Sequence, residues 1–377
     1  MQIAVLGTGR VGSAIALDLV MDREFRVSAY DRDPAGHLKS FPDGLKIFQK
    51  DLSQSTVLRE CIKDADMVVN ALPGFMGFRV FEEVIRAGKN IVDIAFFSED
   101  PFTLDMLAQE KQVTAIMDCG VAPGMSNLLI GYAAGILDKL ERCEIYVGGL
   151  PVVREWPYEY KAVFSPVDVL EEYIRPARYQ VNGRLVTKPA LSEPEYLNFP
   201  GVGTLEAFNT DGLRTLLKTI PCPNMIEKTL RYPGHLEKMR MLRETGFFGY
   251  EEMVVDGQKI RPIDLTAKLL FPLWELKPGE ADLTVMRVVI EGMAGEEKKR
   301  YTYNLLDRYD VASGITSMAR TTGYTATMMV RLVVAGRFSH KGVCAPEFAG
   351  QDPENVKFIL EGFKKRGIYY DEIIETI

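Results

Sequence analysis

The chain has 377 residues, 47% of them hydrophobic and 26% charged, which is typical of a globular protein with two domains. Its formal net charge of −7 argues against a nucleic-acid partner, because nucleic-acid-binding domains normally present a basic face to phosphate. The sequence has neither an apolar run of about eighteen residues nor a charged leader before an apolar core, which argues against a membrane partner and favours a cytoplasmic protein.

The cysteines predict neither a disulfide framework nor a metal site. There are five of them, an odd number, and no two are spaced as C-x-x-C. Structural zinc is therefore not expected, and reduced thiols fit a cytoplasmic location. Cys119, beside Asp118, is interpreted as a small buried side chain after a strand.

The first predicted elements are an apolar strand over 2–6, a glycine-rich turn and a helix with Ile15 and Leu19 on its inner face. The turn reads G-x-G-x-x-G between strand and helix, which is the setting that a dinucleotide-binding site requires. The helix N-terminus then offers free N–H groups to a pyrophosphate. The predicted coenzyme-binding residues of this turn are Gly7, Thr8, Gly9, Arg10, Val11 and Gly12.

The second predicted strand ends in Asp31, nineteen positions after Gly12. An acid at this position accepts hydrogen bonds from the adenosine ribose and repels a 2′-phosphate, so NAD is favoured over NADP. Arg32 follows directly and could hold a 2′-phosphate, so tolerance of NADP stays open.

Four further strands are predicted over 45–49, 65–71, 90–95 and 113–118, separated by helices over 56–63, 78–87 and 101–110. This alternation predicts an α/β domain over 1–120, with a Rossmann-type, doubly wound parallel sheet and helices on both faces.

Acids recur where these strands end, and ligands bind beyond the carboxyl ends of such sheets. We expect Asp51 to reach the adenine, and Asp93 and Asp118 to lie near the nicotinamide half; each could instead be a helix cap or turn residue. The loop over 70–78 can form a wall of the coenzyme site. Coenzyme contacts are therefore also expected from Asp31, Asp51, Ala71, Leu72, Pro73, Asp93 and Ala95.

From residue 121 onward the pattern changes to strand-like runs over 142–151, 158–165, 178–186 and 281–292, with Asn-Gly and Gly-Glu turns. Such turns suit antiparallel hairpins, so we predict a second, α+β domain over 121–312 with a mainly antiparallel sheet. A helix over 315–336 begins a C-terminal segment, 313–377, which is expected to return to the first domain.

Polar side chains cluster in the second domain beyond what a structural shell needs, although each alone could be an ion pair or a cap. Together they offer cations for a carboxylate, acceptors for an ammonium group, and a base. They are Tyr160, Lys161, Ser165, Arg175, Arg178, Glu206, Asn209, Thr210, Asp211, Arg214, Arg231, Tyr232 and His235.

Taken in order, several segments resemble the saccharopine dehydrogenase-like family, and within it the lysine 6-dehydrogenase branch. They are GTGRVG, ALPGFMGF, DCGVAPGMSN, IYVGGLP, YKAVFSP, EYIRPAR, EAFNTDGLRTL, TLRYPGHLEKM and TTGYTA. The resemblance implies NAD-dependent oxidative deamination of the side-chain amine of L-lysine, which yields the 6-semialdehyde, ammonia and NADH. It also implies a homodimer that forms through the second domain.

The clustering and the resemblance together suggest roles for individual residues. Hydride can leave C6 of lysine only when the amine is neutral, and a free amine titrates near about 10.4, so a base is needed. The proposed bases are Asp118, His235 and Lys161; the substrate is expected to contact Arg214, Arg231, Tyr232, Asp211 and Thr210. Arg231 and Arg214 are rival clamps for the substrate carboxylate, and Asp211 would neutralise the α-ammonium group.

Two alternatives stay open. Saccharopine or a carboxylated polyamine such as carboxynorspermidine would need a longer pocket and a second clamp, which Arg175 or Arg178 could supply. A non-catalytic NAD-binding regulator would bind the coenzyme without turnover.

Overall fold

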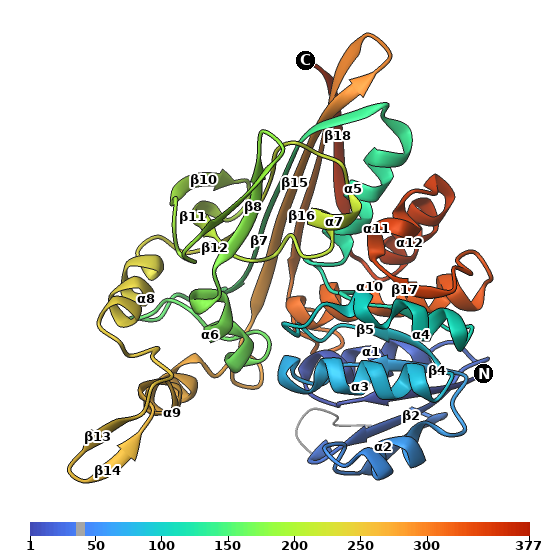
Figure 1. Cartoon of the computed structure of the whole chain (residues 1–377), viewed down its shortest axis with the longest axis horizontal. Coiled ribbons are helices and arrows are strands. Elements are labelled where there is room, and N and C mark those ends of the chain that lie inside the picture. The colour runs from blue at the N-terminus through green and yellow to red at the C-terminus, as the bar shows by residue number, and fades with distance from the viewer. Residues whose placement is uncertain (35–41) are drawn as a thin grey trace. The chain divides into compact units, whose positions relative to one another are not determined.

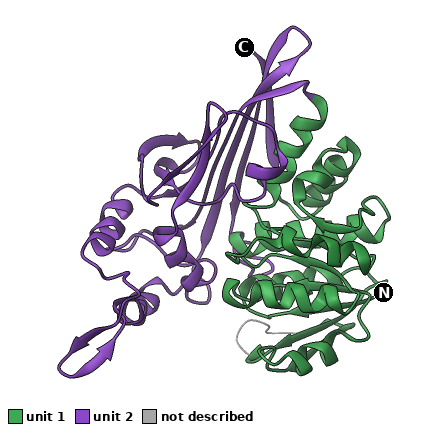
Figure 2. Ribbon diagram, viewed as in Figure 1, with its two compact units in different colours: residues 1–136, 318–369 green, residues 137–317, 370–377 purple. Residues whose placement is uncertain are grey.

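The computed structural model describes residues 1–34 and 42–377. The chain forms two compact units: unit 1 comprises Met1–Ile136 and Met318–Tyr369, and unit 2 comprises Leu137–Ser317 and Tyr370–Ile377 (Figure 2). Within the described ranges, no helix has both the length and the apolarity that crossing a membrane requires.

Unit 1 is built on a seven-stranded sheet in the order β17-β6-β5-β4-β1-β2-β3, and its neighbouring strands are parallel (Figure 1). The strands are β1 (Gln2–Leu6), β2 (Arg26–Asp31), β3 (Leu45–Gln49), β4 (Met67–Asn70), β5 (Asn90–Asp93), β6 (Thr114–Ile116) and β17 (Gly342–Cys344). Every residue of β4 is buried, as expected for a central parallel strand covered on both faces. The predicted Rossmann-type sheet is confirmed.

Helices connect these strands. They are α1 (Arg10–Val20), α2 (Ser55–Ile62), α3 (Gly74–Arg86), the 3-10 helix η2 (Pro101–Leu104), α4 (Asp105–Glu110) and α5 (Met125–Ile136). Their apolar faces pack on the sheet: Phe81 and Val84 of α3 are fully buried in one core cluster with Val68 of β4. This burial is what selects the helix register, because apolar residues three and four apart share one face.

The chain returns to unit 1 through α10 (Ser317–Val334), β17, α11 (Pro346–Gly350) and α12 (Pro353–Lys365). β17 extends the sheet by pairing with β6. A Cβ atom on Gly131 of α5 would lie 2.2 Å from the Glu347 carbonyl oxygen of α11, so the close approach of these helices requires glycine. Asp18 of α1 accepts hydrogen bonds from Arg331 of α10 and from Arg366, which follows α12.

Unit 2 carries a nine-stranded sheet in the order β10-β11-β12-β7-β15-β16-β18, with the β8–β9 hairpin paired to β12. The strands are β7 (Lys139–Pro151), β8 (Ala177–Val181), β9 (Arg184–Lys188), β10 (Glu195–Phe199), β11 (Gly203–Asn209), β12 (Met225–Arg231), β15 (Asp282–Ala294), β16 (Glu297–Arg308) and β18 (Tyr370–Thr376). β12 and β7 are parallel, and the remaining pairs are antiparallel. The predicted mainly antiparallel sheet is confirmed.

The helices of unit 2 are α6 (Pro166–Ile174), α7 (Leu216–Thr219), α8 (His235–Glu244) and α9 (Pro262–Trp274), and a separate hairpin joins β13 (Met253–Val255) to β14 (Gln258–Ile260). One core cluster includes Tyr173 of α6, Leu236 of α8, Trp274 of α9 and Phe208 of β11. These three helices thus cover one face of the sheet near β11.

The structure departs from the sequence-based expectations in two respects, the boundaries of the units and the run over 158–165. The units differ from the expected boundaries because α5 packs against α11 in unit 1, whereas β18 pairs with β16 in unit 2. The run over 158–165 is not a strand: within it only Ala162 forms a bridge, to Glu275. Its apolar residues Tyr160 and Ala162 pack into the helical core cluster instead, which outweighs their strand propensity.

Candidate functional site

The glycine-rich turn of unit 1 lies between β1 and α1. Gly7 has a φ of 92°, and a Cβ atom there would lie 2.7 Å from the Ala71 carbonyl oxygen. A Cβ on Gly12 would lie 2.0 Å from the Gly7 carbonyl oxygen. These two glycines are therefore required by the close packing of the turn itself.

Gly9 is different, because a Cβ atom placed on it would meet no described atom within 4 Å. It is the N-cap residue of α1, and no side chain caps that helix end. The hydroxyl of Thr8 is buried and has no hydrogen-bond partner in the described part of the chain. Open space above a helix N-terminus, next to an unpartnered hydroxyl, fits the pyrophosphate of a dinucleotide.

Asp31 is fixed at the end of β2 by two backbone hydrogen bonds. Its Oδ2 accepts from the Thr8 amide at 2.6 Å, and its Oδ1 accepts from the Asp33 amide at 2.9 Å. The carboxylate is thereby tied to the glycine-rich turn, as a ribose-binding acid would need to be.

The expected walls of the coenzyme site are linked by Asp93. This carboxylate is fully buried and accepts from Asn70 Nδ2 at 2.7 Å and from the Ala95 amide at 2.6 Å. Asn70 Oδ1 in turn accepts from the Leu72 amide at 3.3 Å. The segments over 70–73 and 93–95 are thus held together at the carboxyl ends of β4 and β5.

Asp51 and Asp118, the two other acids predicted at strand ends, have different surroundings. Asp51 is exposed and accepts from the Ser53 amide at 3.0 Å, and its hydrogen bonds from Ser53 lower its pKa. Asp118 is 2% exposed and has a left-handed backbone with a φ of 52°. The amide of its neighbour Cys119 donates to the Asp93 carbonyl at 2.9 Å. Strained non-glycine residues of this kind cluster at functional sites, whereas Asp51 has the geometry of a turn residue.

Unit 2 contains a buried polar network centred on Arg231, at the end of β12. The Arg231 guanidinium donates to Tyr173 Oη at 3.2 Å, to Glu172 Oε2 at 2.9 Å and to the Leu230 carbonyl at 3.0 Å. It lies 4.6 Å from the centroid of the Tyr160 ring. Arg231 is 2% exposed. Its guanidinium is held by Glu172 and Tyr173 of α6 and by the face of the Tyr160 ring.

His235 extends this network at the first position of α8. Its Nδ1 lies 2.9 Å from the Tyr158 carbonyl, and its Nε2 lies 3.0 Å from Tyr173 Oη. Because a carbonyl only accepts, Nδ1 carries the proton, so Nε2 accepts from the Tyr173 hydroxyl. Tyr173 therefore accepts from Arg231 and donates to His235.

Burial and the charge of Arg231 lower the pKa of His235 to about 3. An imidazole with an ordinary pKa near about 6.5 would exchange protons near neutral pH, whereas this one stays uncharged there. The imidazole is a neutral, 1% exposed hydrogen-bonding group.

Sequence reasoning missed two glutamates beside this network. Burial raises the pKa of Glu172, against the opposing effect of Arg231. Burial also raises the pKa of Glu227 to about 8, and Glu227 Oε2 accepts from Thr210 Oγ1 at 2.6 Å. A sequence signal existed: Glu227, Thr229 and Arg231 alternate along β12, which places three polar side chains on one face.

The other predicted substrate residues lie in unit 2 with partners of their own. Asp211 accepts from Arg178 Nε at 2.9 Å and from Nη2 at 2.8 Å. Lys161 pairs with Glu155 at 3.1 Å. Arg214 is partly exposed and has a left-handed φ of 51°.

Tyr232 does not share the surroundings of Arg231, although the two are consecutive. Its hydroxyl donates to the Pro151 carbonyl at 2.9 Å, and its ring packs in another core cluster, with Tyr146 and Leu150. Arg231 and Tyr232 are therefore held by different groups, one in the network around Tyr173 and the other in this second core cluster.

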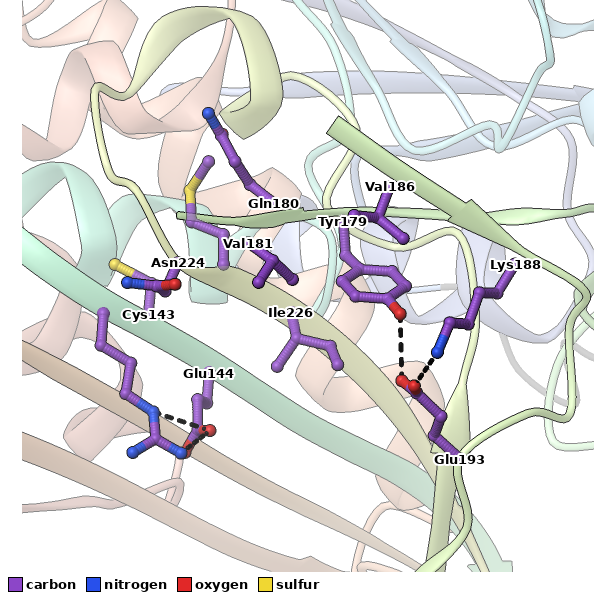
Figure 3. A pocket seen from close by; sticks show the side chains of 12 residues that line it. Cys143, Glu144, Tyr179, Gln180, Val181, Val186, Lys188, Glu193, Asn224 and Ile226 are labelled. Atoms are coloured by element: carbon purple, nitrogen blue, oxygen red, sulfur yellow. Dashed lines mark hydrogen bonds and ion pairs between the residues drawn. The ribbon is translucent and has the colours of Figure 1, made fainter. Parts of the chain in front are cut away.

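A pocket of about 470 Å³ lies elsewhere in unit 2, among β7, β12 and the β8–β9 hairpin (Figure 3). Its lining includes Ile226, whose side chain points to the face of β12 opposite that of Glu227. Its charged groups pair locally, Arg142 with Glu144 and Lys188 with Glu193. The pocket contains none of the predicted site residues.

Comparisons with known proteins cover nearly the whole chain. A family profile described as "Saccharopine dehydrogenase NADP binding domain" matches residues 3–116, and one described as "Saccharopine dehydrogenase C-terminal domain" matches residues 120–368. The chain is 24% identical over 451 residues to saccharopine dehydrogenase [NADP(+), L-glutamate-forming] of Saccharomyces cerevisiae, with 98% of each chain covered.

Two further relatives are named for other activities. The chain is 23% identical to the mitochondrial alpha-aminoadipic semialdehyde synthase of Bos taurus, with 98% of this chain and 47% of that protein covered, so it spans about half of this relative. It is 22% identical to carboxyaminopropylagmatine dehydrogenase of Synechocystis, with 99% of this chain and 98% of that protein covered. The solved apo saccharopine dehydrogenase (L-Glu forming) from Saccharomyces cerevisiae shares the fold, with a TM-score of 0.80 at 20% identity and 100% of both chains covered.

Proposed function

The chain belongs to the saccharopine dehydrogenase family, and we propose that it is an NAD-dependent oxidoreductase that deaminates the side chain of L-lysine. The products would be the 6-semialdehyde, which cyclises to piperideine-6-carboxylate, together with ammonia and NADH. Written in full, R–CH₂–NH₃⁺ + NAD⁺ + H₂O gives R–CHO + NH₄⁺ + NADH + H⁺, which balances atoms and charge.

The observation that carries the coenzyme part is the open space at Gly9 above the N-terminus of α1. Backbone amides there can bind a pyrophosphate, and the unpartnered Thr8 hydroxyl can donate to it. When bound, the nicotinamide accepts the hydride. The choice of NAD over NADP rests on Asp31, because its fixed negative charge opposes a 2′-phosphate.

Roles for this chain's residues follow from their surroundings. We assign the substrate carboxylate to Arg214, which is partly exposed and conformationally strained, in preference to the buried Arg231. Asp118 keeps its proposed role near the reacting centre because it is buried at the carboxyl end of the parallel sheet. Asp211 would meet the α-ammonium group, and its pairing with Arg178 would hold its orientation.

Saccharopine and carboxylated polyamines are the second class of substrate. The relatives named for saccharopine and for carboxyaminopropylagmatine each align with nearly the whole chain, which supports this alternative. Saccharopine carries an additional carboxylate end group, and Arg175 or Arg178 would have to bind it.

The test is the absorbance of NADH when purified protein is mixed with NAD and L-lysine, with an ammonia assay in parallel. Saccharopine, carboxynorspermidine and NADP are run as separate reactions. Lysine-dependent NADH with equimolar ammonia is the expected result. Turnover of saccharopine alone would move the proposal to the second substrate class, and coenzyme binding without any turnover would favour a regulator.

We also propose that the protein is a cytoplasmic homodimer. Light scattering during gel filtration should then give about twice the chain mass of 42.3 kDa. A species at the chain mass would contradict the dimer.

A further inference from the structure

Glu172 of unit 2 is a carboxylate that is accessible to solvent and is paired with a buried arginine, Arg231. The side chain of Glu172 is 21% exposed, whereas that of its partner Arg231 is 3% exposed. Tyr173 and His235, which complete the network, are 0% and 1% exposed. Glu172 is therefore the member of this network that is exposed to solvent.

A chain of hydrogen bonds with defined donors and acceptors leads from Tyr158 to Glu172. The Tyr158 carbonyl sets the His235 tautomer, and His235 Nε2 then orients the Tyr173 hydroxyl. That hydroxyl accepts from Arg231 Nε, which directs Arg231 Nη2 at Glu172 Oε2. A single guanidinium contact occupies Glu172 within the described residues, so its second oxygen is available to a ligand.

The titratable groups around Glu172 bear on its strength as a base. Burial raises the pKa of Glu172, Arg231 on β12 and Arg175 on the following turn oppose this rise, and Asp168 on α6 adds to it. A carboxylate with a raised pKa holds a proton more strongly, which suits a group that takes one from a substrate. Glu227 on β12, whose pKa is raised to about 8, is mostly protonated at neutral pH and does not compete. His235 on α8 is neutral, so it adds no positive charge beside Glu172.

A primary ammonium group matches this arrangement. Its compact charge and N–H donors suit a partly exposed carboxylate whose partner Arg231 packs against the rings of Tyr160 and Tyr173. The hydroxyl of Tyr160 is buried, with no hydrogen-bond partner in residues 1–34 and 42–377, and its ring packs on Arg231.

We propose that Glu172 binds the reacting ammonium group of the amino-acid substrate and takes its proton. This proposal rests on the proposed function. An N–H bond of R–CH₂–NH₃⁺ breaks and the proton moves to the Glu172 carboxylate, leaving R–CH₂–NH₂ and a carboxylic acid. The freed lone pair can then form the C=N bond when the neighbouring carbon loses its hydride in the NAD-dependent oxidation proposed above. Arg231, Tyr173 and His235 are positioning residues for Glu172.

The test compares Glu172→Gln with Glu171→Gln. Glu171 is the adjacent residue of α6, but it pairs with Tyr250 and Arg175, outside the network. Both variants and wild type are assayed with whichever of lysine, saccharopine or carboxynorspermidine the wild type oxidises. NADH binding is measured by fluorescence, and unfolding by differential scanning fluorimetry.

Glu172→Gln should lower kcat/KM by about 10²- to 10⁴-fold, as expected for loss of a general base, and should remove the acidic limb of its pH profile. NADH affinity should stay within about twofold of wild type, and Glu171→Gln should retain activity and the limb. Glu172→Asp, which restores the carboxylate, should recover part of the rate and the acidic limb.

An active wild type with an unchanged acidic limb in Glu172→Gln would overturn the assignment. So would a folded Glu172→Asp variant without the acidic limb. This second result decides the matter even if Glu172→Gln fails to fold. Failure of the proposed function is distinct, because the wild type itself would then oxidise none of these amines.

Discussion

The Nε2 atom of His235 lies 3.0 Å from the hydroxyl of Tyr173, sixty-two residues earlier in the chain. This contact joins α8 to α6 and makes the imidazole a hydrogen-bond acceptor inside the core. A residue that suggests acid–base catalysis in the sequence thus serves to orient a tyrosine, and through it Arg231.

Stability below neutral pH should depend on His235. Its pKa falls from 6.5 to about 3 in the folded protein, so the unfolded chain binds the proton more tightly. The stability that the neutral imidazole contributes to the folded protein is complete above pH 6.5 and declines as the pH falls toward 3. Between pH 6.5 and 5 the wild type should lose about 2 kcal/mol more unfolding free energy than His235→Gln in denaturant titrations. Equal losses would contradict a buried neutral imidazole.

Replacing Tyr173 by phenylalanine should test the network without changing the ring. The variant leaves Arg231 Nε and His235 Nε2 buried without their partner, which costs about 1–3 kcal/mol. Urea denaturation measures this loss. Tyr179→Phe is the control, because that hydroxyl bonds to Glu193, which is itself partly exposed, and should cost less than about 1 kcal/mol.

Alanine substitutions at Gly9 and Gly12 should separate coenzyme binding from folding. Gly9 has a φ of −61° and open space, so Gly9→Ala should fold normally but crowd the pyrophosphate and weaken NADH binding at least about tenfold. Gly12→Ala would place Cβ 2.0 Å from the Gly7 carbonyl oxygen and should cost about 3 kcal/mol of stability. NADH fluorescence and thermal unfolding distinguish the two, and equal behaviour would refute the assignment of Gly9.

Asp31→Ser should reduce the preference for NAD. The change removes the charge that opposes a 2′-phosphate, so the ratio of kcat/KM for NAD to that for NADP should fall by about tenfold. Steady-state assays with both coenzymes give this ratio. A wild type that already prefers NADP would show that Arg32 dominates over Asp31.

The two arginines considered as carboxylate clamps should respond differently to methionine. Arg231→Met removes one partner of a buried ion pair and should destabilise the protein by about 3–5 kcal/mol. Arg214→Met should destabilise the protein less than Arg231→Met does, and should raise KM for the amino acid by about tenfold or more. An unchanged KM in a folded Arg214→Met variant would remove Arg214 from the substrate site.

Local patterns in the sequence determined the nucleotide-binding half of the molecule. The alternation of apolar strands and amphipathic helices, with G-x-G-x-x-G and Asp31 at their expected spacing, depends on neighbours along the chain and predicts the parallel sheet directly. The same holds for the hairpins with Asn-Gly and Gly-Glu turns.

Only the tertiary structure decided what Arg231, His235 and Glu172 do. Arg231 and Glu172 are fifty-nine residues apart, and their pairing requires α6 to lie beside the end of β12. Burial there lowers the pKa of His235 to about 3. Tyr160 and Ala162 pack in the helical core cluster, so the run over 158–165 does not form a strand. Desolvation and long-range packing arise from residues distant in sequence, so no local pattern encodes them.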